Sequence, residues 1–544
     1  MNPSVDPRQK LRELGPADLL VVAPAGCGKT YALADRAAGL IRAGHIASPR
    51  KILALTFSNK ARDNLNARLR QVMSARESAS VTVSNFHGLA GRILRAHGKV
   101  LGLDPQQAFP EKVRVNRHRE AAGITYRNSE AADLALSQAK VGLWDDDEVL
   151  RRLAAAGNAE ALRYESALRE AGLIDYNDLI RYGARLLADP RVAQLYHEHF
   201  AVVLVDEVQD LSLLQFGMVQ AIGAGRTTYA GDPAQGIYAF AGAEPDLVFE
   251  AIHAVVQEAV ELNVSYRSSP AVLAAVNALA AELGTTRLQC ASPEKWGDDA
   301  KVEVVISEDP EEEASALVPA IRQQLEAQPD LTIGVVARRT TRLNELITAL
   351  EADGIAYQNW QLDTHQPEIV GLLQRHVGEA TARRIEPEAQ LQRLAELCQA
   401  DLPIDAAEAS DHLSGAIASL REQLEAGATV AQAVATCRAV QDSEAPVTPG
   451  LHLLTGHAGK GQEFDVVYIV GLEEGHIPDF RSTSDDARLA EELRVLHVMA
   501  SRAKTRLVCT RVENRWRTED WYAAESPSRW WDLLANVVSP LTCA

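Results

Sequence analysis

The segment 23–30, APAGCGKT, constrains the fold of this chain more than any other part of the sequence. It follows an apolar run of strand length, LLVV at 19–22, and precedes YALADRAAGLI, a stretch with the pattern of a helix. A strand, a loop with Gly26 and Gly28, and a new helix form a phosphate-binding loop, because glycines let backbone N–H groups wrap the phosphates. The sequence therefore predicts a nucleoside triphosphate site within an α/β fold.

The side chains of Lys29 and Thr30, at the end of the loop, indicate what each would bind. Lys29 is predicted to reach the β- and γ-phosphates, and Thr30 to hold Mg²⁺. Ala23 stands where the strict pattern has glycine, so the match is one residue short. The residues predicted to bind the nucleotide along the loop are Ala23, Pro24, Ala25, Gly26, Cys27, Gly28, Lys29, Thr30 and Tyr31.

A second motif supplies two carboxylates. Residues 202–210 read VVLVDEVQD, an apolar strand that ends in Asp206 and Glu207. Two acids after a buried strand are common on protein surfaces, but here a phosphate-binding loop lies upstream. Asp206 is predicted to bind Mg²⁺ through water, and Glu207 to polarise the attacking water, as Mg²⁺-assisted phosphoryl transfer requires.

The chain alternates strand-length apolar runs with helical patterns in two clusters, near 18–270 and 300–530. Such alternation indicates two α/β lobes built on parallel sheets. The stretches between them read as helix without strands. We expect a first lobe of 1–99 and 186–270 with a helical insertion at 100–185, and a second lobe of 271–370 and 446–544 with a short helical insertion at 371–445 and a tryptophan-rich tail.

Composition narrows the class of protein. The net charge of −19 argues against a protein that coats nucleic acid without specificity, but it permits local phosphate contacts. The six cysteines are scattered without a CxxC pair, which argues against a zinc site and a disulfide framework. We find no apolar run long enough for a membrane span and no signal-like N-terminus. A cytoplasmic protein without a membrane partner is expected.

Further motifs, in their order along the chain, resemble those of the UvrD-like superfamily 1 DNA helicases. The sequence DEVQD at 206–210 resembles the DExQD box of that family. The other segments that carry the resemblance are ALTFSNKARDNLNARL from Ala54, SNFHG from Ser84, LIDYNDL from Leu173, GDPAQGIYAFAGA from Gly231, VSYRS from Val264, TGHAGKGQEFD from Thr455 and EELRVLHVMASRAK from Glu491.

This resemblance implies two RecA-like lobes of a P-loop NTPase, with Mg-ATP hydrolysed between them to drive 3′-to-5′ movement on single-stranded DNA or a DNA junction. It assigns Gln235, Arg267 and Arg502 to the γ-phosphate, Gln9 to the adenine and Glu463 to the ribose. Phe240 and Ala241 stand where the family usually has Trp and Arg. The residues implied as DNA contacts are Thr56, Phe57, Asn59, Asn85, His87, Tyr238, Phe240 and His457.

A competing interpretation is a DNA-activated ATPase subunit that regulates a partner nuclease in antiviral defence, as compact UvrD-like proteins do. The short second insertion favours it modestly, and a nuclease or other protein partner would follow. Within that insertion, Leu413, Ile417, Leu420 and Leu424 form an apolar stripe at helical spacing. The stripe is buried either against neighbouring helices or under a docking partner. The tail with Trp516, Trp521, Trp530 and Trp531 is likewise expected to pack on the second lobe or to dock a protein.

Overall fold

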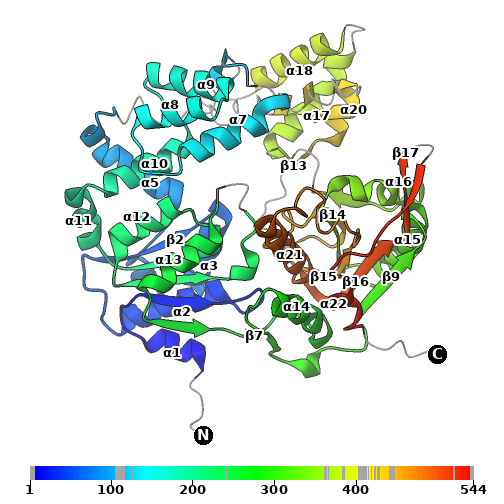
Figure 1. Ribbon diagram of the computed structural model, residues 1–544, viewed down its shortest axis with the longest axis horizontal. Helices are drawn as coiled ribbons and strands as arrows, with labels where there is room; N and C mark the ends of the chain where they lie inside the picture. The colour runs from blue at the N-terminus through cyan, green and yellow to red at the C-terminus, as the bar shows by residue number, and fades with distance from the viewer. Residues whose placement is uncertain are drawn as a thin grey trace. The chain divides into compact units, whose positions relative to one another are not determined.

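The computed structural model describes residues 6–104, 117–119, 121–124, 126–238, 242–360, 364–365, 367–382, 386–401, 413, 416–417, 420–421, 424, 429–439, 447–518 and 521–538. By contacts, the chain divides into two compact units (Figure 1). The first unit comprises 1–297 and 490–497, and the second comprises 298–489 and 498–544. None of the helices in the described part of the chain has the length and apolarity that a membrane crossing needs.

The first unit is built on a six-stranded sheet in which every pairing is parallel. The strand order is β3-β2-β4-β5-β1-β6. Continuous apolar residues form the central strands, because helices cover both faces of a parallel sheet. The strands are β1 (Leu19–Val22), β2 (Lys51–Thr56), β3 (Val81–Asn85), β4 (Phe200–Val205), β5 (Thr227–Gly231) and β6 (Glu258–Glu261).

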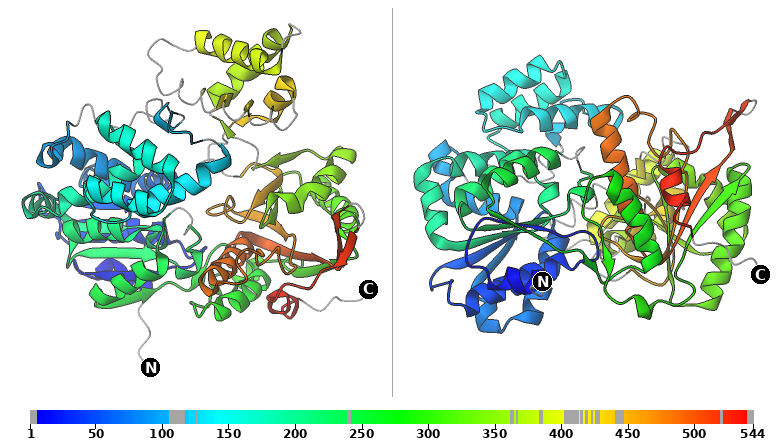
Figure 2. Two further views of the ribbon diagram at one scale, coloured as in Figure 1. Left: turned by 45° about the horizontal axis from the view of Figure 1, so that its top comes forward. Right: turned by 60° about the horizontal axis from the view of Figure 1, so that its bottom comes forward.

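Helices pack on this sheet, and α7, α8 and α9 form a separate helical region of the same unit (Figure 2). Side chains of α5, α10, α12 and α13 share one buried core with β2, β4 and β5. The helices of the first unit are α1 (Pro7–Glu13), α2 (Lys29–Arg42), α3 (Asn59–Val72), α4 (Ala75–Ser78), α5 (Phe86–His97), α7 (Tyr126–Ala139), α8 (Asp146–Ala155), α9 (Ala159–Glu170), α10 (Tyr176–Leu187), α11 (Pro190–His199), α12 (Leu213–Gly223), α13 (Pro245–Val255) and α14 (Pro270–Glu282).

The second unit has a second six-stranded parallel sheet, with the order β11-β14-β10-β15-β16-β9. Its strands are β9 (Val302–Ser307), β10 (Thr332–Ala337), β11 (Tyr357–Asn359), β14 (Gly450–Thr455), β15 (Phe464–Ile469) and β16 (Ala503–Val512). The helices after residue 300 are α15 (Pro310–Ala327), α16 (Asn344–Ala352), α17 (Pro367–Thr381), α18 (Pro387–Asp401), α20 (Val430–Thr436), α21 (Asp486–Ala500) and α22 (Trp531–Ala535). The predicted fold class, α/β with two parallel-sheet lobes of RecA-like type, is confirmed.

The limits of the units differ from the expected ones at residue 270. The first unit continues to Gly297, because β7 (Val264–Ser265) pairs with β8 (Gln289–Cys290) and α14 lies between them in sequence. The segment 371–445 was expected to be helical only, yet the short strand β13 (Arg438–Ala439) pairs with β12 (Thr364–His365). The other domain limits stay predictions.

The apolar stripe of the second insertion is buried within that insertion. Leu413, Ile417 and Leu420 are at most 7% exposed, and Leu424 packs against the same core. That core also contains apolar side chains of α17, α18 and α20. Burial against neighbouring helices, rather than an exposed docking face, is therefore what the structure shows.

The C-terminal tail packs on the second unit where its side chains are described. Trp530 and Trp531 are 6% and 7% exposed. The backbone N–H of Ser528 donates to the carbonyl of Leu472, and the Arg511 guanidinium lies 5.3 Å from the Trp531 ring centroid. The hairpin of β17 (Asn514–Thr518) and β18 (Trp521–Ala524) precedes them, and the side chains of Trp516 and Trp521 lie outside the described residues.

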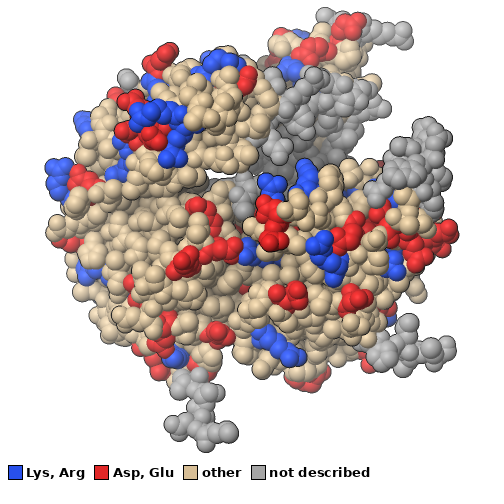
Figure 3. All heavy atoms as spheres, in the orientation of Figure 1, with Lys and Arg blue, Asp and Glu red and all other residues tan. Residues whose placement is uncertain are grey.

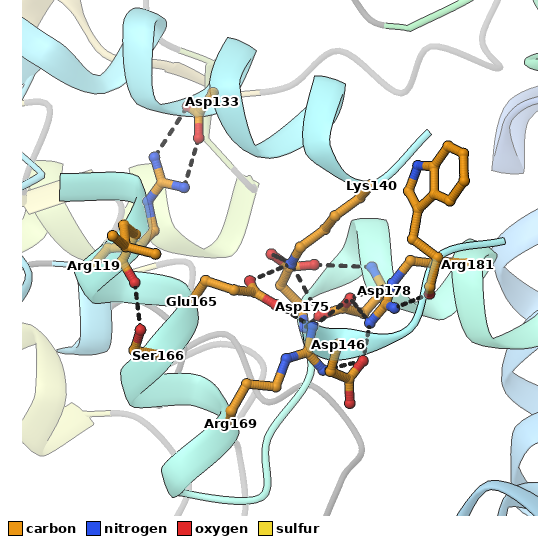
Figure 4. Close-up of polar contacts among 12 residues, drawn as sticks. Arg119, Asp133, Lys140, Asp146, Glu165, Ser166, Arg169, Asp175, Asp178 and Arg181 are labelled. Carbon is orange, nitrogen blue, oxygen red and sulfur yellow. Dashed lines mark hydrogen bonds and ion pairs between the residues drawn. The ribbon is translucent and has the colours of Figure 1, made fainter. Parts of the chain in front are cut away.

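A buried ion network joins the helical insertion of the first unit to α10 (Figure 4). The Lys140 ammonium, at the end of α7, contacts Glu165, Asp175 and Asp178 at 2.7, 2.8 and 3.0 Å. Arginines extend the network to a fourth acid: Arg169 and Arg181 pair with Asp178, and Arg169, Arg181 and Arg185 pair with Asp146. Since α10 packs into the core of the sheet, the network fixes the insertion on the lobe.

Candidate nucleotide site

The phosphate-binding loop leaves β1 at Val22 and enters α2 at Lys29. Gly26 and Gly28 have φ of 81° and 69°, the left-handed region that favours glycine. A Cβ on Gly26 would also lie 2.7 Å from Ser265 Oγ and 2.8 Å from Arg267 Cβ. Ala23, where the usual motif has glycine, has no positive φ and donates its N–H to Gly231, so alanine fits there without strain.

Three predicted residues converge at the end of the loop. The Lys29 ammonium forms an ion pair with Glu207 and lies 3.9 Å from Asp206 Oδ1. The Thr30 hydroxyl donates to Asp206 Oδ2 at 3.2 Å. Lys29 and Asp206 are buried, whereas the Glu207 side chain keeps 28% of its surface exposed. The two motifs therefore meet at the carboxyl ends of β1 and β4.

Burial and neighbouring charges shift the pKa values of Asp206 and Lys29. Burial raises the pKa of Asp206 to about 6, and the charge of Glu207 adds to this while Lys29 opposes it. Although burial favours the neutral amine of Lys29, Glu207 and Asp206 hold its pKa above the ordinary value. Among the described residues, Glu207 is the single non-glycine with a positive φ, 57°. Strained backbone of this kind clusters at functional sites.

A chain of hydrogen bonds leads from Glu207 to Gln235. The Gln209 amide donates to Glu207, and its oxygen accepts the backbone N–H of Asp232 at 3.1 Å. Gln235 is buried after β5, and its amide donates to Asp232 Oδ2 at 2.6 Å. Sequence reasoning singled out Gln235 but missed Gln209 and Asp232. The signal was present, since both lie inside the motifs DEVQD and GDPAQ.

Helix α1 brings Arg8, a residue that the sequence analysis did not single out, to the phosphate-binding loop. The amide of Gln9, predicted to read adenine, donates to Glu13 of its own helix at 2.8 Å. The neighbouring Arg8 donates to the Cys27 carbonyl at 2.6 Å, and its guanidinium lies 4.6 Å from the ring centroid of Tyr266. Arg8, rather than Gln9, therefore contacts the loop in this structure.

Arg267 follows the segment that lines the loop. The N–H of Tyr266 donates to the Gly26 carbonyl at 3.0 Å, and the N–H of Arg267 to Ser265 Oγ at 3.3 Å. Arg267 is thereby held beside the turn of the loop, and its contact with a terminal phosphate stays a prediction.

The remaining predicted nucleotide residues belong to the second unit. Arg502 is 1% exposed, and its guanidinium donates to the Val498 carbonyl at 3.0 Å and to Ser501 Oγ at 2.8 Å. Glu463 is partly exposed and precedes Phe464, whose N–H donates to the Arg502 carbonyl. The structure thus places Glu463 and Arg502 on adjoining segments of that unit.

The predicted DNA contacts fall into different environments. The Phe57 and Tyr238 rings stack with centroids 6.0 Å apart and an interplanar angle of 12°. Thr56 has no exposed surface, which a direct contact would require, and its hydroxyl donates to the Ser58 carbonyl. Asn85 uses its side chain to cap α5 by accepting the Gly88 N–H at 2.7 Å.

The other four predicted DNA contacts are two histidines and two residues whose side chains lie outside the described part of the chain. His87, in the first turn of α5, has a pKa lowered by burial. His457 is partly exposed in the connection between β14 and β15. The side chain of Asn59 and the residues Phe240 and Ala241 lie outside the described residues.

A second acidic cluster resembles a metal site by geometry. Glu165, Asp175 and Asp178 each bring one carboxylate oxygen within 4.8 Å of the others. The Lys140 ammonium contacts all three, and so it takes the place that a cation would need. The hydroxyl of Thr30 and the carboxylate of Asp206, which share a hydrogen bond beside the glycine loop, are oxygen donors of the kind that Mg²⁺ prefers.

Comparisons with known proteins identify the family that the chain resembles. Residues 6–255 match the family described as "UvrD/REP helicase N-terminal domain", and residues 368–514 match the "UvrD-like helicase C-terminal domain". "ATP-dependent DNA helicase UvrD2" of Mycobacterium tuberculosis is 26% identical over 607 residues, which cover 99% of this chain and 82% of that protein. "DNA helicase II" of Escherichia coli is 26% identical over 608 residues, covering 92% and 83%.

Proposed function

The chain belongs to the UvrD-like helicase family, and from this membership we propose that it is an ATP-driven motor that moves 3′ to 5′ along single-stranded DNA and separates duplex strands. The observation that carries the proposal is the convergence of Lys29, Thr30, Asp206 and Glu207 at the ends of two parallel strands. ATP and Mg²⁺ are the proposed cofactors.

The Lys29–Glu207 ion pair suggests how nucleotide prepares the site. The triphosphate would compete with Glu207 for the Lys29 ammonium, because the loop presents that ammonium and its N–H groups to phosphate. Glu207 would then be released to orient the attacking water, while the Gln209 amide keeps its carboxylate in place. The nucleotide's own binding thereby assembles the general base.

Mg²⁺, when bound, would neutralise charge on the β- and γ-phosphates. Thr30 and Asp206 are the residues that would hold it, directly or through water. The hydrogen-bond chain through Asp232 would hold Gln235 toward the terminal phosphate. Arg267 and, from its motif alone, Arg502 are proposed to stabilise the charge that develops on the γ-phosphoryl group.

The mixed surface charge fits a protein that binds DNA through a few local contacts rather than through one extended basic surface (Figure 3). The face drawn in Figure 3 carries acidic and basic side chains intermixed. A few phosphate contacts combined with stacking on aromatic rings, such as the Phe57–Tyr238 pair, would suffice for a single strand. The relatives reported above carry helicase names, and neither name mentions a partner nuclease.

Strand displacement tests the proposal. The purified chain, Mg-ATP and a duplex with a 3′ single-stranded tail should release the labelled strand, whereas a duplex with a 5′ tail should stay paired. A blunt duplex and the non-hydrolysable ATP analogue serve as controls. Release from the 5′-tailed substrate alone would overturn the proposed direction, and a lack of release from every tailed duplex would overturn the helicase.

A further inference from the structure

The loop that follows β15 holds a single phenylalanine out to solvent. Phe480 is 61% exposed, while Ile477 and Asp479 beside it are at most 2% exposed. The Phe480 N–H donates to the Gly475 carbonyl at 3.2 Å, and the Thr483 hydroxyl donates to the Phe480 carbonyl at 2.9 Å. An isolated exposed apolar side chain is ordinary. This one is distinguished by how firmly its backbone is held and by what flanks its ring.

Two arginines contact the buried carboxylate of Asp479, which precedes Phe480 in the chain. The Arg339 guanidinium lies 4.8 Å from the Phe480 ring centroid and makes a bidentate pair with Asp479. Arg481 donates its backbone N–H to the same carboxylate at 2.9 Å and approaches it with its guanidinium at 3.4 Å. We name Arg339, Phe480 and Arg481 the Phe480 platform. Both guanidiniums of the platform therefore contact the Asp479 carboxylate.

The Phe480 platform is formed by segments that follow adjacent parallel strands of the second sheet. Arg339 follows β10, and the Phe480 loop follows β15; β10 pairs in parallel with both β15 and β14. His457, a predicted DNA contact, follows β14. The segments after three adjacent parallel strands lie at one edge of the sheet, and open α/β sheets bind their ligands at this edge.

The chemistry of the Phe480 platform selects the kind of ligand. A single exposed ring offers a stacking face to a planar group but no continuous apolar surface for a protein. The residues that follow it, from Arg481 to Asp486, are polar or charged. Arginines beside an aromatic ring suit the alternating bases and phosphates of a single nucleic acid strand.

We propose that Phe480 stacks on a base of the single-stranded nucleic acid that this chain binds, with Arg339 and Arg481 on the flanking phosphates. This rests on the proposed function, because it adds a contact to the same DNA track. Asp479 is a positioning residue: it binds both guanidiniums, holds Arg339 beside the ring and does not touch the strand.

The test is Phe480→Ala, measured as the affinity for a labelled single-stranded oligonucleotide and as the concentration that half-stimulates ATP turnover. Both should weaken about five- to tenfold, since stacking on one base contributes roughly 1–3 kcal/mol. Phe480→Trp should restore binding, because it keeps a stacking face. Ile306→Ala is the matched control, since Ile306 is 49% exposed on β9 of the same unit. It should leave both values unchanged.

Two further measurements separate base stacking from charge. An oligonucleotide of abasic sites should bind wild-type protein and Phe480→Ala equally. Arg481→Ala should reduce the slope of log affinity against log salt by about one phosphate contact. If wild-type turnover responds to DNA but Phe480→Ala binds as wild type does, this proposal is overturned alone. If wild-type turnover does not respond to DNA, the proposed function itself fails.

Discussion

Two buried lysines of the first unit are each surrounded by carboxylates, yet their surroundings differ. Lys140 contacts Glu165, Asp175 and Asp178, all buried. Lys29 contacts Glu207, which is part exposed, and lies 3.9 Å from Asp206. The first cluster lies at a junction of helices, and the second lies at the end of a glycine loop.

The pKa shifts of the carboxylates differ between the two clusters. Around Lys140, arginines 169, 181 and 185 bring the cations to four, against four carboxylates when Asp146 is included. Although burial alone would raise the pKa of Asp178, Lys140, Arg169 and Arg181 hold it well below its usual range. At Asp206, beside Lys29, burial instead raises the pKa to about 6. We infer that the Lys140 cluster stabilises the fold, whereas the Lys29 cluster serves the proposed nucleotide site.

The largest expected effect is that of Lys29→Ala on ATP turnover. Loss of the phosphate ligand should lower turnover by about 10³-fold or more, while the thermal unfolding midpoint changes little. Steady-state phosphate release and a thermal melt on the same preparation measure both. Lys10→Ala is the control, since Lys10 is a half-exposed lysine paired with Glu258. Near-normal turnover in Lys29→Ala would show that residues 23–30 are not the phosphate-binding loop of the ATP site.

Glu207→Gln should act on the chemical step rather than on binding. The amide keeps the shape of the side chain but does not polarise water, so turnover should fall about 10²- to 10⁴-fold. Nucleotide affinity should be kept or should rise, because the ion pair that competes for Lys29 is lost. Equilibrium binding of a fluorescent ATP analogue and single-turnover hydrolysis separate the two. Lost affinity with normal hydrolysis of bound ATP would contradict the role of Glu207.

Lys140→Met should lower the stability of the fold and leave ATP turnover nearly unchanged, the reverse of what is expected for Lys29→Ala. It leaves three buried carboxylates without their ammonium, and breaking a buried pair in this way costs about 3–5 kcal/mol. The free energy of unfolding should fall by that amount in urea, while turnover per folded molecule stays within a few-fold of wild type. Lys10→Met, at the surface, should cost at most about 1 kcal/mol. If Lys140→Met kept its stability but lost turnover, the distinction between the two clusters would be wrong.

Local patterns predicted the parts of the site that lie within one motif. The loop at 23–30, the acids after β4, and the two parallel sheets follow from short-range chemistry and strand patterns, and the fold class is confirmed. The apolar stripe from Leu413 to Leu424 required burial, and its neighbouring helices provide it.

Features that depend on distant pairs were not predictable. Lys140 meets Glu165 and Asp178 only when three helices pack, and no spacing in the sequence encodes that contact. The turn of α1 that brings Arg8, and not Gln9, to the Cys27 carbonyl is decided by tertiary packing. The pairing of β7 with β8, which extends the first unit to Gly297, is likewise a contact between short segments with little pattern of their own.

The most direct test of the account is steady-state ATP turnover by the wild-type chain with and without a single-stranded DNA oligonucleotide. The Lys29 cluster is proposed to hydrolyse ATP only as part of a DNA motor. Turnover should therefore rise many-fold with DNA, and the oligonucleotide concentration needed should rise with salt as phosphate contacts are screened. Equal turnover with and without nucleic acid of any form would contradict the motor and leave only an ATP-hydrolysing site.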